Sequence, residues 1–183
     1  MIYKKPTMRN YFLILAVFAI LTGCDKIDEL TKFDIEYDQT VVIPSTTGIN
    51  LPFDIYTPET ETNSESEFEV NDTRKDLIEE IQLKKLELTI TSPDAADFSF
   101  LESIEVYISA EDVEEIKIAW MDDVPETTSN KLQLDTSDMD LKEYIKKDKF
   151  NLRLNTVTDE VINQDHELDV NSTFFVDAKI LGL

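Results

Sequence analysis

The chain has 183 residues, of which 39 are acidic and 17 basic, so its formal net charge is −22. A surface of this charge repels phosphate backbones and argues against nucleic-acid binding. Its single cysteine, Cys24, and its single histidine, His166, exclude a disulfide framework, a cysteine-based zinc site and a histidine-rich metal centre.

Residues 1–23 contain three basic residues, no acid and an apolar run over 11–21. A basic segment followed by a short apolar run is typical of an export signal, and the run is shorter than the roughly 20 residues of a membrane-spanning helix. The run ends in Leu21-Thr22-Gly23-Cys24. This tetrapeptide resembles the lipobox of bacterial lipoproteins.

In that class the leader is cleaved before the cysteine, which carries a covalent diacylglycerol on sulfur and an N-acyl chain. The resemblance covers the leader alone and implies a signal peptide over 1–23 and lipidation of Cys24. We interpret the residues that follow as a lipidated N-terminus and tether over 24–31 and one domain over 32–183. Several acyl chains anchor a protein stably, whereas a single chain does so only marginally. The alternative is an uncleaved membrane-anchoring signal that contains an incidental cysteine.

The residues after Cys24 bear on localisation in the cell envelope. An aspartate in the position of Asp25 retains lipoproteins in the inner membrane under one sorting rule. The stretch 25–29, Asp-Lys-Ile-Asp-Glu, resembles instead the lysine-plus-acid export signal of surface lipoproteins in other Gram-negative groups. We therefore favour the outer membrane over the inner membrane.

Beyond the tether, apolar and polar residues alternate repeatedly, as they do in strands with one buried face. This pattern predicts about nine strands. Trp120 shares its phase with Ile116 and Ile118, which predicts that Trp120 lies in the core. The segments with this alternation are 33–43, 51–55, 68–70, 86–90, 104–108, 116–120, 132–134, 150–154 and 168–180.

Two segments have the spacing of a helix start. Residues 73–76 and 137–140 each place a serine or threonine three residues before an acid, ahead of apolar residues at helical intervals. They predict short helices through Ile81 and Ile145. The segment 58–72 has six acids and no base, which indicates a flexible, solvent-facing excursion.

This pattern favours a mainly β protein, a single antiparallel β-sandwich of immunoglobulin-like or related Greek-key type with one or two short helices. The last strand, 168–180, either completes this sandwich or pairs with the sheet edge of another subunit. We favour the first arrangement.

No catalytic constellation is recognisable. His166 lies in a polar stretch, 163–167, that predicts an exposed turn, and no serine lies in a Gly-x-Ser-x-Gly elbow. Phosphate-binding glycine loops are also lacking. With 39 acids, paired carboxylates arise by chance, so they do not indicate a glycosidase. We predict a protein that is not an enzyme.

Two kinds of ligand are weakly indicated. Calcium takes several carboxylate oxygens, but no EF-hand loop occurs and solvated acidic loops are the simpler interpretation. Carbohydrate modules present aromatic rings to sugar C–H groups, and Tyr56 and Tyr107 fall on the polar phase of their strands. The calcium candidates are Asp94 with Asp97, Asp122 with Asp123, and Asp135 with Asp138 and Asp140.

The sequence therefore predicts a lipid-anchored cell-envelope protein with a non-catalytic binding or structural role and no cofactor. Alternatives are a carbohydrate- or calcium-binding surface module and a subunit of a surface assembly. Expected partners are the membrane, through the lipid, and an unidentified envelope protein or glycan.

Overall fold

The structure is a computed structural model that describes residues 31–45, 49–126 and 129–179. The leader 1–23, Cys24 and the tether up to residue 30 lie outside the described residues. Among the residues that are described, no helix is long and apolar enough to cross a membrane.

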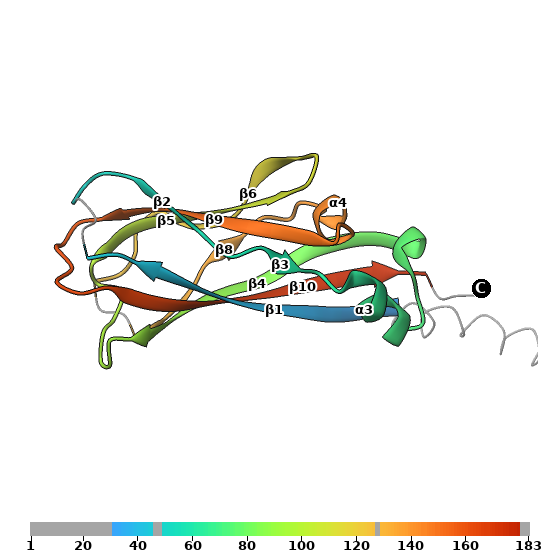
Figure 1. The fold of residues 1–183 in the computed structure, drawn as a ribbon, viewed down its shortest axis with the longest axis horizontal. Coiled ribbons are helices and arrows are strands. Elements are labelled where there is room, and N and C mark those ends of the chain that lie inside the picture. The colour runs from blue at the N-terminus through green and yellow to red at the C-terminus, as the bar shows by residue number, and fades with distance from the viewer. Residues whose placement is uncertain (1–30, 46–48, 127–128, 180–183) are drawn as a thin grey trace, which may run out of the picture.

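Two antiparallel sheets pack face to face, as a β-sandwich requires (Figure 1). The four-stranded sheet has the order β1-β10-β4-β7, from β1 (Lys32–Ile43), β10 (His166–Ala178), β4 (Ile78–Ser92) and β7 (Lys131–Gln133). The predicted fold class is confirmed. The second sheet has six strands. Five of them follow the order β2-β9-β5-β6-β8, and the short strand β3 also pairs with β9. Their bounds are β2 (Phe53–Tyr56), β9 (Lys149–Thr158), β5 (Leu101–Ala110), β6 (Val113–Met121), β8 (Asp135–Thr136) and β3 (Thr60–Glu61).

The C-terminal strand β10 lies between β1 and β4, so it completes the protein's own sandwich. Its alternating Leu168, Val170, Phe174 and Val176 are fully buried. Ser172 interrupts this apolar series, and its hydroxyl donates to the carbonyl oxygen of Tyr37 at 3.3 Å.

Three aromatic rings join the two sheets at the centre of the core. Tyr37 of β1 and Phe174 of β10 meet Phe150 of β9 edge to face, with centroid separations of 5.1–6.1 Å. The Tyr37 hydroxyl donates to the carbonyl oxygen of Thr62 at 2.8 Å, which satisfies its one polar group inside the core. Burial, with a smaller contribution from the Glu67 carboxylate, raises the pKa of Tyr37.

The segment 58–72 is not a solvent-facing excursion, and residues 68–70 are not a strand. After β3 the chain forms helix α3 (Ser64–Val70), whose Phe68 is fully buried against Phe33. Val70 is 81% exposed, so the two residues do not share a face as they would in a strand. Glu65 and Glu67 lie in the first turn, where a helix dipole stabilises acids.

The predicted helix over 73–81 is also wrong. The hydroxyl of Thr73 donates to the carbonyl oxygen of Lys179 at 2.7 Å instead of capping a helix. A 3-10 turn, η2 (Lys75–Leu77), leads directly into β4. Ile78 and Ile81 both face the core because a register shift against β10 falls between them, so a β-bulge mimics helical spacing.

The predicted second helix is present as α4 (Lys142–Ile145). The Oδ1 of Asp140 accepts hydrogen bonds from the backbone N–H groups of Ile81 and Lys142, both at 3.1 Å. This carboxylate therefore fixes the start of α4 to β4. Tyr144 adds a link to β6 by donating its hydroxyl to the carbonyl oxygen of Glu114.

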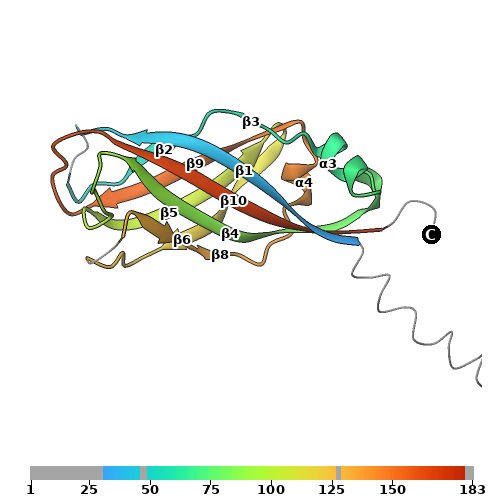
Figure 2. The same ribbon diagram turned by 90° about the horizontal axis from the view of Figure 1, so that it is seen from below.

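The sandwich is elongated along its strands (Figure 2). The Lys32 end of β1 lies at the same end as α3 and α4, which are on the right in Figures 1 and 2. The Ile43 end of β1 and the turn between β9 and β10 lie at the opposite end.

Candidate binding face

A β-bulge in β6 turns Trp120 away from the core, contrary to the prediction. Lys117 pairs with Tyr107 and Ala119 with Val106, so Ile118 has no partner in β5. The alternation along β6 reverses at this extra residue, and Ile118 and Ala119 are both fully buried. Trp120 therefore lies half-buried on the outer side of the six-stranded sheet.

Strand register aligns polar and aromatic side chains on this side in two neighbouring rows. One row runs across the strands through Tyr56, Arg153, Tyr107 and Lys117. The next row runs through Asp54, Asn155, Glu105, Trp120 and Asp135. We call the outer surface formed by the following nine residues the aromatic face: Asp54, Tyr56, Glu105, Tyr107, Glu115, Lys117, Trp120, Arg153 and Asn155.

Arg153 lies at the centre of the aromatic face. Its Nη1 donates to Asp54 Oδ1 at 2.7 Å, its Nη2 donates to Glu115 Oε2 at 2.6 Å, and its Nε donates to Glu115 Oε1 at 3.0 Å. Its guanidinium lies 4.1 Å from the centroid of the Tyr107 ring. These contacts hold the guanidinium in one orientation and raise the pKa of Arg153, chiefly through the hydrogen bonds that it donates to Glu115.

A second cluster adjoins it around Glu105. The carboxylate of Glu105 accepts hydrogen bonds from the Tyr107 hydroxyl at 2.6 Å and from Lys117 Nζ at 2.9 Å. These contacts lower the pKa of Glu105 and raise the pKa of Lys117. Lys117 Nζ also lies 5.5 Å from the centroid of the Trp120 ring, within the range of a cation–π contact.

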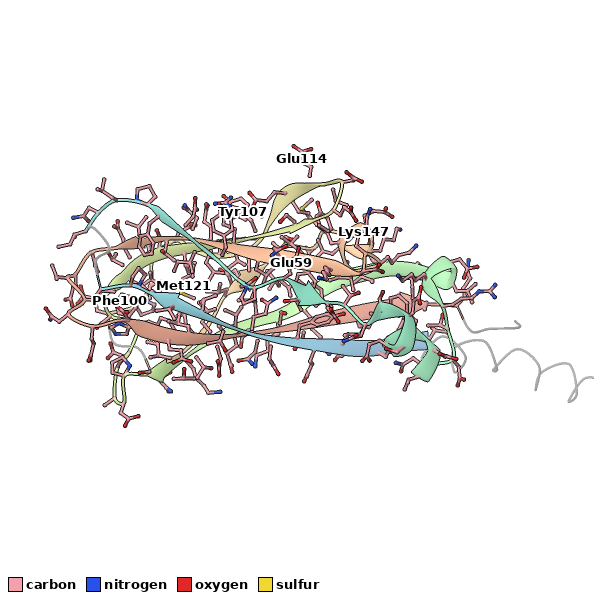
Figure 3. All side chains as sticks on the ribbon, in the orientation of Figure 1. Glu59, Phe100, Tyr107, Glu114, Met121 and Lys147 are labelled. Atoms are coloured by element: carbon pink, nitrogen blue, oxygen red, sulfur yellow. The ribbon has the colours of Figure 1, made fainter. Side chains whose placement is uncertain are left out.

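The aromatic face collects every tyrosine and tryptophan of the described residues that is not buried. Tyr37 and Tyr144 lie in the core, Tyr56 is 64% exposed, and Tyr107 and Trp120 are half-buried. The predicted outward orientation of Tyr56 and Tyr107 is confirmed. Figure 3 labels Tyr107 on the side of the six-stranded sheet that faces away from the other sheet.

The outer side of the four-stranded sheet differs in composition. Along β1 it presents Asp34, Glu36 and Asp38, and Lys84 of β4 pairs with Asp34 at 2.6 Å. Phe175 of β10 is half-buried on this side. The two outer surfaces are therefore distinct in chemistry, and aromatic rings gather on one of them.

The acidic calcium candidates do not converge in the structure. Among residues 31–45, 49–126 and 129–179, no three histidine, cysteine, aspartate or glutamate side chains are placed to hold one metal ion. Asp97 accepts a hydrogen bond from the backbone N–H of Ser99 at 3.0 Å, and Asp140 organises α4. The remaining candidates are exposed: Asp94, Asp122, Asp123, Asp135 and Asp138.

His166 is buried, not exposed in a turn. It is the first residue of β10, is 7% exposed, and its ring centroid lies 4.6 Å from that of Phe100. Its Nδ1 lies 3.0 Å from the carbonyl oxygen of Gln164, to which it donates when protonated. The stretch 163–167 is polar, but its histidine closes one end of the core.

Arg153, Asn155 and Asp54 were missed as candidates on the sequence. A signal for one of them was present, because Arg153 occupies the polar phase of the strand predicted over 150–154; Asn155 continues that phase one residue beyond its predicted end. Both residues form hydrogen bonds to Asp54 because β2 pairs with β9, and these two segments are about 100 residues apart in the chain.

Comparisons with known proteins assign no family. No family model matches the chain, and no curated protein matches it either. Among solved structures, a chain of Desmodium yellow mottle tymovirus matches with 10% identity over 83% of this chain and 85% of that chain. Its TM-score of 0.23 is too low to inform either fold or function.

Proposed function

We propose that this protein is a lipid-anchored protein of the cell envelope with a non-catalytic binding role. The observation that carries the anchor is the position of Cys24. The only cysteine of the chain comes two small residues after the end of the apolar run. The lipid supplies the membrane attachment, and the sandwich supplies the binding surface.

The fold is compatible with display from one end. Seven residues, 25–31, separate Cys24 from Lys32, where β1 begins. A tether at this point would attach the lipid near α3 and α4 and leave the opposite end furthest from the membrane (Figure 2). The aromatic face, on the side of the sandwich, would remain accessible from the aqueous phase.

The aromatic face supports binding over a purely structural role. It brings rings, carboxylates, an amide and a fixed guanidinium from four strands to one surface. Assembly through the C-terminal strand has less support, because donating β10 to another subunit would remove the strand between β1 and β4.

The anchor is tested by replacing its attachment atom. In Cys24→Ser cells we expect an unprocessed or released protein that lacks the lipid mass, whereas the wild type fractionates with membranes in its mature form. Mass spectrometry of the N-terminal peptide and membrane fractionation measure the two properties. Thr22→Ser, which keeps the cysteine, is the matched control.

A Cys24→Ser protein that remains mature and fully membrane-bound would overturn the proposal. Metabolic labelling of the wild type with an alkyne fatty acid gives an independent result, because it needs no variant to be expressed. Protease treatment of intact cells then reports which side of the envelope the sandwich faces, since only a surface-exposed sandwich is degraded without lysis.

A further inference from the structure

We infer that the aromatic face binds a neutral oligosaccharide or polysaccharide chain. This inference rests on the proposed binding role of the sandwich and names the ligand class of that role. It is carried by the bulge at Ile118, which adds Trp120 to the same surface as Tyr56 and Tyr107.

The exposed rings match the apolar faces of sugars. The face of an aromatic ring is electrostatically negative, and the axial C–H groups of a pyranose are weakly positive and apolar, so the two stack. Tyr56 offers an open ring in β2, and Trp120 offers a half-exposed one in β6. With adjacent strands about 4.8 Å apart, these two positions lie about 15 Å apart across the sheet. This separation suits several linked sugar units more than one monosaccharide.

Between the rings lie polar groups suited to sugar hydroxyls. Asp54 Oδ1 accepts from both Arg153 Nη1 and Asn155 Nδ2, at 2.7 and 2.8 Å. Within the part of the chain that the structure describes, no further side-chain hydrogen bond occupies Asp54 Oδ2 or Asn155 Oδ1. Because existing contacts already fix these side chains, binding orders few additional rotamers.

Charge selects a neutral ligand. Removal of the leader leaves 14 bases and 39 acids, a net charge of −25, which repels sulfated or uronic polysaccharides. The aromatic face itself holds three carboxylates and two cations, which pair with one another. Its charges are therefore largely neutralised by one another, which leaves little net charge to attract an ionic ligand.

The same composition disfavours a protein partner. The buried core of a protein–protein interface is depleted in charged residues. Here Lys117, Glu105 and Glu115 belong to the aromatic face, and lysine and glutamate are among the residues in which such interfaces are depleted. Among the described residues, the exposed large apolar side chains other than Tyr56 lie outside the aromatic face: Val42, Ile49, Leu51, Val70, Met139 and Val161.

The experiment uses the full chain, purified in a detergent without a sugar head group. The protein is applied to an array of neutral and anionic glycans from plant, algal, fungal, bacterial and animal sources. Retained glycans are then titrated against the fluorescence of Trp120, which is the only tryptophan of the chain and so reports on the aromatic face alone.

We expect retention of one or more neutral glycans and a saturable change in Trp120 fluorescence. Tyr56→Ala and Trp120→Ala should each weaken retention on the array at least about tenfold, as expected for a central aromatic contact. Tyr56→Phe, which keeps the ring, should retain binding. Lys84→Ala, on the opposite sheet, is the matched surface control and should bind as the wild type does.

Three results would overturn the inference. They are no glycan retained, retention of anionic glycans only, and retention that neither Tyr56→Ala nor Trp120→Ala weakens. Tyr56 is largely exposed, so its variant keeps the test valid even where Trp120→Ala fails to fold. The array assays purified protein and the Cys24 experiment assays cell fractions, so the anchor and the ligand class can fail separately.

Discussion

The side chain of Arg153 links four strands on the outer side of the six-stranded sheet. From β9 it bonds to Asp54 in β2 and Glu115 in β6, and it stacks on Tyr107 in β5. Exposed ion pairs contribute only about 0–1 kcal/mol each, but the Arg153 side chain is 16% exposed and its contact with Glu115 is bidentate. We therefore expect the ion pairs of Arg153 with Asp54 and Glu115 to contribute to stability at the upper end of that range.

The Asp54 carboxylate predicts a pH-dependent contribution to stability. Hydrogen bonds from Asn155 and then from Arg153 hold the pKa of Asp54 below its usual value. The native state thus favours the ionised form, so the contribution is present above the unfolded pKa of about 3.9 and is lost as pH falls through the lower native pKa. We expect Asp54→Asn to reduce the free energy of unfolding at pH 7, and the deficit to shrink below about pH 4. Urea unfolding of both proteins across this range measures it, and a deficit that grows on acidification would refute the assignment.

Single residues mark where sequence reasoning succeeded and where it failed. The alternation in β5 correctly turned Tyr107 outward, because that residue lies in register with its neighbours. The same argument misplaced Trp120, because the bulged residue Ile118, two positions earlier, changes nothing in the local pattern of polarity. His166 was misplaced for another reason. Its neighbours in the sequence are polar, whereas in the fold it packs against Phe100, which is distant in the sequence.

At the level of elements, strands were predicted well and short helices poorly. Alternation located β1, β5, β9 and β10, since one face of each packs on the core. The segment 64–70 has the polarity of a strand, but it folds as α3 because a single apolar residue, Phe68, anchors it. Tertiary burial decides such a short segment, and its sequence alone cannot.

Helix α3 gives a prediction with its control in the same element. Phe68 is fully buried against Phe33, so Phe68→Ala should lower the free energy of unfolding by about 3–5 kcal/mol. Val70 is 81% exposed, and Val70→Ala should change it by less than about 0.5 kcal/mol. Chemical denaturation compares the two variants. Equal effects would show that 64–70 is not packed as α3 places it.

At the scale of the whole molecule, the two outer surfaces differ in charge and in aromatic content. Along the edge strand β1 the outward residues Asp34, Glu36 and Asp38 place negative charge beside unpaired backbone groups. Charge on an edge strand opposes edge-to-edge pairing with another chain. The aromatic face lies on the other sheet, away from this acidic edge.

The net charge of residues 24–183 predicts how salt affects the stability of the protein without the proposed leader. With 39 acids and 14 bases, the acids outnumber the bases by 25, so we expect repulsion among carboxylates to exceed attraction within ion pairs. Salt at about 0.5 M screens exposed charges beyond several ångströms. We therefore expect the melting temperature at pH 7 to rise from low salt to this concentration. Lys84→Glu, which replaces the ion pair with Asp34 by a repulsive pair, should lower it most at low salt and less as salt is added. A melting temperature that falls with salt in the wild type would mean that paired charges, not the acidic excess, dominate the electrostatic free energy.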